Sequence, residues 1–168
     1  FEYQTLICQL TGMDVSNASM YDGATALAEA CLMSNAHNKK TEFLIAGTLN
    51  PNFRKVLQTT CRGRKITFKE CISDDGTCDL ELLKSSITDN ISGVIVQHPN
   101  AYGNLEDIEQ IEKITHSKDI MFIVAFDPIS LGILKTPGEY NADIAVAEGQ
   151  SLGIPLNYGG PYLGLFTT

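Results

Sequence analysis

The sequence contains no tryptophan, few basic residues and no long apolar run. Lys and Arg together number 12 against 20 Asp and Glu, which gives a formal net charge of −8 at pH 7. The only basic cluster is Arg62, Arg64 and Lys65, so the chain lacks the basic face that nucleic-acid binding usually requires. No apolar run approaches the roughly 20 residues of a membrane span, and no signal-peptide pattern opens the chain. We therefore expect neither a nucleic-acid nor a membrane partner.

Cysteines are present but include no C-x-x-C pair. Five of them in one chain is an odd number, which indicates small core residues and surface thiols rather than a disulfide framework. Such usage is typical of a reducing compartment, so we expect a cytoplasmic protein. Neither Cys nor His occurs at the spacing of zinc ligands, and no metal site is predicted.

The length of 168 residues, 43% of them hydrophobic, fits one domain with a sizeable core. The chain begins at Phe1 rather than Met and runs directly into helical periodicity. We therefore expect residues 1–168 to form a single domain that is a fragment of a longer chain.

Apolar periodicity alternates between helical and strand-like segments. The strand-like segments are short and almost continuously apolar, which predicts an α/β domain with a largely parallel sheet. The predicted helices are 2–10 (with Leu6, Ile7 and Leu10 on one face), 25–34, one that opens at Asn50–Pro51, 80–87 and 104–117 (with Leu105, Ile108, Ile111 and Ile114 inward), and the predicted strands are 42–47, 65–70, 92–98, 120–126 and 143–148.

Sheets of this class bind ligands beyond the carboxyl ends of their strands. This rule selects the residues that directly follow each predicted strand. The segment where the second predicted helix begins is considered with them. The selected segments are 47–48, 98–100, 127–128, 149–151 and 21–25.

Gly23, Ala24 and Thr25 stand where the second helix begins. Free backbone N–H groups, a hydroxyl and the helix dipole would together favour a phosphate or carboxylate there. Asp22 offers a simpler interpretation, in which it caps the helix and Gly23 helps the turn. Caps are much commoner than anion sites, so local sequence favours the cap.

Two further side chains stand at strand ends. Asp127 could pair with a protonated ring nitrogen of a cofactor, or it could begin the turn that Asp-Pro favours, and the two roles are compatible. His98 could stack on a ring or act as an acid or base, although an ordinary hydrogen-bonded side chain is the commoner outcome. His37 and His116 end helices, and we expect both at the surface.

The glycine-rich segment 145–164, "AVAEGQSLGIPLNYGGPYLG", contains no lysine, histidine or cysteine that could do covalent chemistry. Glu148 is its only charged side chain. The segment reads either as a ligand-binding loop or as a tight crossover that returns the chain into an edge strand. No Ser-His-Asp or Cys-His arrangement can be assembled, and no Walker loop or G-x-G-x-x-G pattern occurs.

Three segments closely resemble the P-protein family of the glycine cleavage system. They are "TGMDVSNASMYDGATALAEA" (11–30), "DPISLGILKTPGEYNADI" (127–144) and "EGQSLGIPLNYGGPYLG" (148–164). The likeness runs along the whole chain and is closest to subunit 1 of the two-subunit form. It implies a three-layer α/β/α fold, the large domain of the aspartate aminotransferase-like (fold type I) pyridoxal phosphate enzymes.

The resemblance also implies a function. The complete P-protein, glycine dehydrogenase (aminomethyl-transferring), uses pyridoxal phosphate to decarboxylate glycine and passes the aminomethyl group to the lipoyl group of the H-protein. Asp127 matches the aspartate that pairs with the cofactor's pyridine nitrogen. Alignment on Ile154–Pro155 puts Gln150 where the family has the Schiff-base lysine, and His98 stands where the superfamily commonly has an asparagine. Gln150 cannot form an imine.

We therefore expect no catalytic residue in this chain, which alone should be inactive, and pyridoxal phosphate on subunit 2 of a heterotetramer. Seven residues become vestigial or interface candidates: Asp22, Gly23, Thr25, His98, Asp127, Gln150 and Ser151. Two alternatives stay open. One is a regulatory pseudo-enzyme that binds an anion or nucleotide at Gly23–Thr25. The other is a self-sufficient enzyme whose lysine lies elsewhere, with Lys135 as the nearest candidate.

Overall fold

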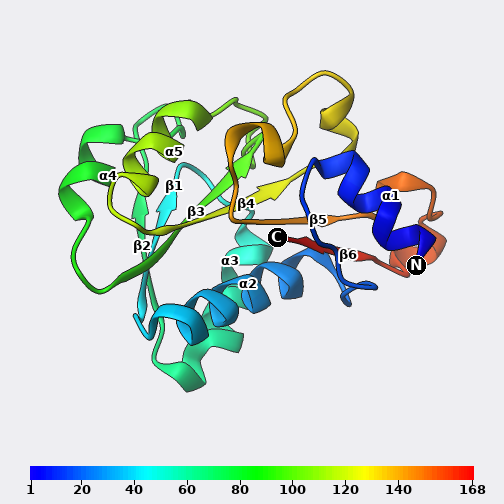
Figure 1. Cartoon of the computed structure of the whole chain (residues 1–168), viewed down its shortest axis with the longest axis horizontal. Coiled ribbons are helices and arrows are strands. Elements are labelled where there is room, and N and C mark those ends of the chain that lie inside the picture. The colour runs from blue at the N-terminus through cyan, green and yellow to red at the C-terminus, as the bar shows by residue number, and fades with distance from the viewer.

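A single six-stranded sheet organises the molecule, with helices on both faces (Figure 1). The computed structural model describes all 168 residues. The strands lie in the order β2-β1-β3-β4-β5-β6; the first five are parallel, and β6 runs antiparallel to β5 at one edge. Their bounds are β1 Glu42–Ala46, β2 Thr67–Cys71, β3 Ile91–His98, β4 Met121–Phe126, β5 Ile144–Glu148 and β6 Gly164–Thr167. The predicted mostly parallel sheet is confirmed.

The helices form the two outer layers, which confirms the three-layer α/β/α architecture. Helices α2 (Gly23–Asn38) and α3 (Pro51–Cys61) cover one face of the sheet, and α1 (Glu2–Thr11), α4 (Leu80–Ser86) and α5 (Ile108–His116) cover the other. None of the helices has the combination of length and apolar character needed to cross a membrane. Short 3₁₀ turns occupy the connections: η1 Arg62–Arg64, η2 Pro128–Gly132, η3 Pro137–Tyr140, η4 Gln150–Leu152 and η5 Asn157–Gly159.

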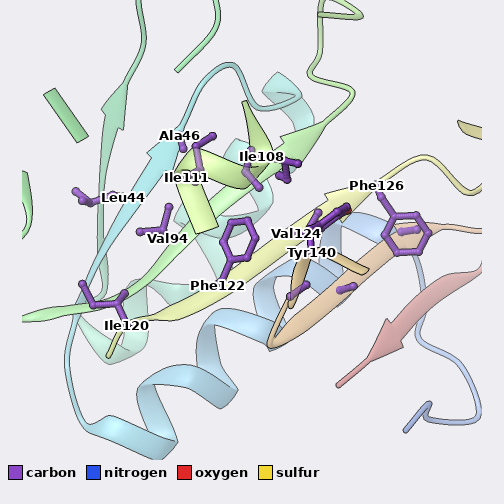
Figure 2. Close-up of a cluster of buried hydrophobic side chains, with 14 of the residues drawn as sticks. Leu44, Ala46, Val94, Ile108, Ile111, Ile120, Phe122, Val124, Phe126 and Tyr140 are labelled. Carbon is purple, nitrogen blue, oxygen red and sulfur yellow. The ribbon is translucent and has the colours of Figure 1, made fainter. Parts of the chain in front are cut away.

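Two apolar cores lie on the two faces of the sheet. Alternate residues of β4 serve them: Phe122 and Val124 face the α4–α5 layer, as Figure 2 shows, while Ile123 and Ala125 face α2 and α3. The larger of these side chains, Phe122, Ile123 and Val124, each contribute about 1.5–3 kcal/mol when fully buried. Burial on both faces explains why the strand segments are continuously apolar instead of alternating.

Two helical predictions require correction. The helix predicted at 104–117 begins only at Ile108, because Asp107 caps it by accepting a hydrogen bond from the N–H of Gln110. Leu105, predicted inward, is 57% exposed, and Glu106 is buried in its place. In α1, Ile7 is buried as predicted, but Leu6, predicted on the same face, is 62% exposed.

His116 ties α5 to the amino ends of β4 and β5. Its Nδ1 lies 2.9 Å from Glu112 Oε1 and its Nε2 lies 3.0 Å from Asp143 Oδ2. The same Asp143 oxygen accepts a hydrogen bond from the N–H of Phe122. Burial alone would lower the pKa of His116, but the two carboxylates outweigh it and raise the pKa above its ordinary value. His116 ends α5 at a partly exposed position, as expected, and it also bridges the carboxylates of Glu112 and Asp143.

The His116 bridge makes stability depend on pH. The folded pKa exceeds the unfolded value of about 6.5, so the stabilisation is fully present below that value and is lost as pH rises through the folded pKa. Because the cluster is partly exposed, we expect a loss below about 1 kcal/mol. Urea unfolding of the full-length chain between pH 6 and 9 measures it. The His116→Gln variant should show a flatter profile, and an unchanged slope in that variant would contradict the assignment.

Candidate functional site

A cavity of about 250 Å³ opens at the carboxyl edge of the sheet, above the ends of β3, β4 and β5. A neighbouring cavity of about 290 Å³ lies against the start of α2 and shares Phe53 and Glu148 with the first. This is the edge at which sheets of this class bind ligands. The first cavity, called the edge cavity below, is lined by Phe53, Gln97, Ala125, Phe126, Asp127, Pro128, Glu148, Gln150 and Ser151.

The carboxylate of Glu148 lies between the two cavities and is fully engaged by backbone. Its Oε2 accepts a hydrogen bond from the N–H of Gly23 at 3.0 Å. Its Oε1 accepts two more at 2.9 Å, from the N–H groups of Gln150 and Leu163. One side chain thus joins the N-terminus of α2, the turn after β5 and the segment that leads into β6.

Asp22 caps α2 as the simpler interpretation proposed. Its Oδ1 accepts hydrogen bonds from the N–H and the hydroxyl of Thr25, both at 2.7 Å. The N–H of Asp22 donates in return to Thr25 Oγ1 at 3.2 Å, which completes a capping box. Asp22 and Glu148 together therefore engage the N–H groups of Gly23 and Thr25 and the Thr25 hydroxyl.

Three predicted residues line the edge cavity, and they differ in exposure and hydrogen bonding. Asp127 is exposed, and its Oδ1 accepts a hydrogen bond from the N–H of Ile129, so it begins the predicted turn while also lining the cavity. Ser151 is exposed at the rim. Gln150 lines the cavity, but its buried Nε2 has no hydrogen-bond partner.

His98 does not join this group. Its Nδ1 accepts a hydrogen bond from the N–H of Glu106, and its ring stands edge-on to Tyr140 on the α4–α5 side of the sheet. Burial lowers its pKa. The neighbour Gln97 faces the edge cavity instead, and its Oε1 accepts a hydrogen bond from the N–H of Asn50. Strand alternation signals that Gln97 and His98 face opposite ways, but the sequence does not say which one faces the cavity.

A buried polar cluster around Glu106, which no local sequence pattern indicates, lies among the loops that follow β2 and β3. The Glu106 carboxylate accepts hydrogen bonds from the N–H of Cys78 at 2.7 Å and from Asn100 Nδ2 at 2.8 Å. Burial is the main cause that raises the pKa of Glu106. This cluster ties the loops after β2 and β3 together, so its role is to hold these loops in place.

The charge around the two cavities has one sign. Their charged lining residues are Asp22, Asp127 and Glu148, and no Lys, Arg or His lines either cavity. No group of three His, Cys, Asp or Glu side chains is arranged to hold a metal ion. All five cysteines are free thiols, three of them buried. The arrangement has no nucleophile–base pair and no cation that could hold a phosphate.

The family model described as "Glycine cleavage system P-protein" matches residues 1–168. The probable glycine dehydrogenase (decarboxylating) subunit 1 of Chloroherpeton thalassium is 51% identical over 166 residues, which cover 99% of this chain and 38% of that protein. The chain thus spans well under half the length of the curated relatives it matches.

Solved structures agree with this likeness. A crystal structure of the glycine decarboxylase (P-protein) of the glycine cleavage system, in inhibitor-bound form, superposes with a TM-score of 0.93 at 39% identity, covering all of this chain and 38% of that one. A putative O-acetylhomoserine (thiol)-lyase from Campylobacter jejuni, which carries a pyridoxyl-lysine phosphate, gives 0.71 at 16% identity, over 98% of this chain and 39% of that one. The second likeness concerns the fold alone.

The Nε2 donor of Gln150, which has no hydrogen-bond partner, predicts how a substitution at this position changes the free energy of unfolding. A buried donor without a partner destabilises the folded state, so Gln150→Met, which keeps the length and removes the donor, should raise the free energy of unfolding by about 1 kcal/mol. Gln97→Met is the matched control: it removes the acceptor used by Asn50 and should lower that free energy by a similar amount. Urea unfolding measures both, and a destabilised Gln150→Met would contradict the assignment.

Proposed function

Since this chain belongs to the family of the glycine cleavage system P-protein, we propose that it supports pyridoxal-phosphate-dependent glycine decarboxylation without holding the cofactor itself. In this proposal it is part of one subunit of a heterotetramer in the cytoplasm, and subunit 2 carries the cofactor. The aminomethyl group then passes to the lipoyl group of the H-protein. The subunit 1 names of the relatives support the existence of a partner subunit.

One observation carries this proposal: the edge cavity contains an amide where imine chemistry needs an amine. Gln150 lines the cavity, and no lysine does. When bound, the cofactor supplies an electron sink for the carbanion. The residues here do not fit it, because its phosphate would meet Glu148 at the start of α2 and no cation in the lining. This chain therefore carries no step of the cofactor chemistry.

What the chain offers instead is an apolar surface beside the edge cavity. In the loop after η4, Tyr158 is fully exposed and Leu156 is 73% exposed, and Leu152 and Tyr162 flank them with partial exposure. Turn η2, which contains the exposed Ile129, packs against η4, and the exposed Ile133 directly follows η2. Exposed apolar side chains gathered in one region are typical of interaction sites. We take the cofactor-carrying subunit as the occupant, because this surface borders the cavity whose chemistry that subunit would complete.

The two alternatives find less support. An anion-binding module at Gly23–Thr25 needs free donors, but Glu148 and Asp22 engage the N–H groups of Gly23 and Thr25. A self-sufficient enzyme needs a free lysine in the cavity. Lys135 forms an ion pair with Glu109 on α5 and lies outside the cavity lining.

Exchange of bicarbonate carbon into glycine tests the function. We expect the lysine-bearing subunit with lipoylated H-protein to gain activity when the full-length form of this chain is co-expressed, and this chain without the other subunit to show none. Equal exchange rates with and without this chain would remove the supporting role.

A substitution on the apolar surface tests the interface. Leu156→Asp introduces a charge where we expect apolar contact, and we expect about a 30-fold weaker affinity for the partner subunit, which corresponds to a loss of about 2 kcal/mol. Leu105→Asp, at an exposed leucine before α5, is the matched control and should bind normally. Loss of stability of the full-length chain alone on Leu156→Asp would show that the same polypeptide covers this surface.

A further inference from the structure

We propose that Glu148 is a built-in anion: its carboxylate takes the place of a ligand phosphate at the start of α2 and so excludes phosphate-bearing ligands from this chain. The inference deepens the proposed function, on which the choice of pyridoxal phosphate as the relevant ligand rests. It makes Glu148, rather than Gln150 alone, the residue that determines what the edge cavity accepts.

The hydrogen bonds supply the first argument. A helix N-terminus binds phosphate through its first free N–H groups. In α2 the N–H of Gly23 donates to Glu148 Oε2, and the N–H and hydroxyl of Thr25 donate to Asp22. The second oxygen of Glu148 is held by the N–H groups of Gln150 and Leu163. The Glu148 carboxylate is therefore fixed by three N–H groups, and a phosphate could gain the Gly23 donor only by displacing it. Glu148 and Asp22 thus hold the N–H groups of two of the first three residues of α2.

Close packing supplies an independent argument. A Cβ built on Gly23 would lie 2.8 Å from the backbone N of Glu148, which is closer than real Cβ atoms approach. A Cβ on Gly164 would lie 2.5 Å from the carbonyl oxygen of Asp22. The start of α2 is thus pressed directly against β5 and β6. A phosphate could therefore approach the start of α2 only from the neighbouring cavity, where the carboxylates of Asp22 and Glu148 form part of the lining.

Charge supplies a third argument. A phosphate placed at the start of α2 would lie beside Asp22 and Glu148, and no cationic side chain lines either cavity to offset the repulsion. A neutral ring or a cationic group faces no such repulsion. The exclusion therefore applies to phosphate-bearing ligands in particular, and a ligand that lacks the phosphate should be accepted more readily.

The experiment restores an amine and compares two aldehydes. Full-length chains with Gln150→Lys, alone or combined with Glu148→Ala, are incubated with pyridoxal phosphate or with pyridoxal. The lysine amine and the aldehyde lose water to form an imine, borohydride reduces the C=N bond, and peptide mass spectrometry quantifies the label on residue 150. We expect Gln150→Lys alone to favour pyridoxal about tenfold, and Glu148→Ala to reverse this preference.

Two controls distinguish the effect of Glu148 from the loss of any cavity carboxylate and from a loss of folding. Asp127→Asn with Gln150→Lys removes a cavity carboxylate that does not bond α2, and it should keep the preference for pyridoxal. Thermal unfolding is followed in parallel, and Glu148→Gln, which removes the charge with little change of shape, replaces Glu148→Ala if the latter does not fold. Equal labelling of Gln150→Lys by both aldehydes would overturn the proposal.

If none of the lysine variants is labelled, a phosphate titration that needs no lysine at position 150 tests the proposal. Inorganic phosphate is titrated with the wild-type chain and with the folded Glu148 variant, and its ³¹P line width is followed. Broadening is expected only with the variant, and its absence there would overturn the proposal. Neither experiment involves the partner subunit or glycine, so a failed exchange assay and a failed exclusion test are distinguishable.

Discussion

The fold at the carboxyl edge depends on one carboxylate. Glu148, at the end of β5, accepts hydrogen bonds from Gly23, Gln150 and Leu163, which lie 125, 2 and 15 residues away along the chain. Hydrogen bonds to a charged acceptor are stronger than neutral ones, and here they join the start of α2 to the antiparallel edge of the sheet. The positive end of the α2 dipole favours a negative charge at this point. The molecule supplies that charge from its own chain.

The position of this carboxylate follows from the architecture. Parallel sheets of this class bring helix N-termini and strand carboxyl ends to one edge, where N–H groups need acceptors. A phosphate-bearing ligand is one acceptor for them, and a side chain from a neighbouring strand is another. Glycines at positions 23 and 164 let the backbones approach closely enough for the second solution. The glycine-rich loop thus has a packing role that persists whether or not a ligand binds.

Local sequence patterns predict the helices and strands, but they do not predict which residues bond to one another at the carboxyl edge of the sheet. Continuous apolar segments identified the strands because both faces of the sheet are covered, and the Asp22 cap was recognised because capping is decided within four residues. The acceptor of the Gly23 N–H could not be found this way, since Glu148 is 125 residues distant. The alternation of side chains along a strand places Gln97 and His98 on opposite faces of the sheet, but it does not tell which of them faces the cavity. Leu105 was assigned inward because helical periodicity extends past the true N-cap, Asp107.

Residues 148 and 150 are linked through one turn. The backbone N–H of residue 150 donates to the side chain of residue 148, and that bond does not depend on which side chain residue 150 carries. A lysine at position 150 would therefore enter a cavity whose anion position is already filled by Glu148. The amide at position 150 cannot form an imine, and the carboxylate at position 148 already accepts the Gly23 N–H and repels a second anion. A chain with both features keeps the packing of this fold, and this agrees with the proposal that the cofactor is held by another subunit.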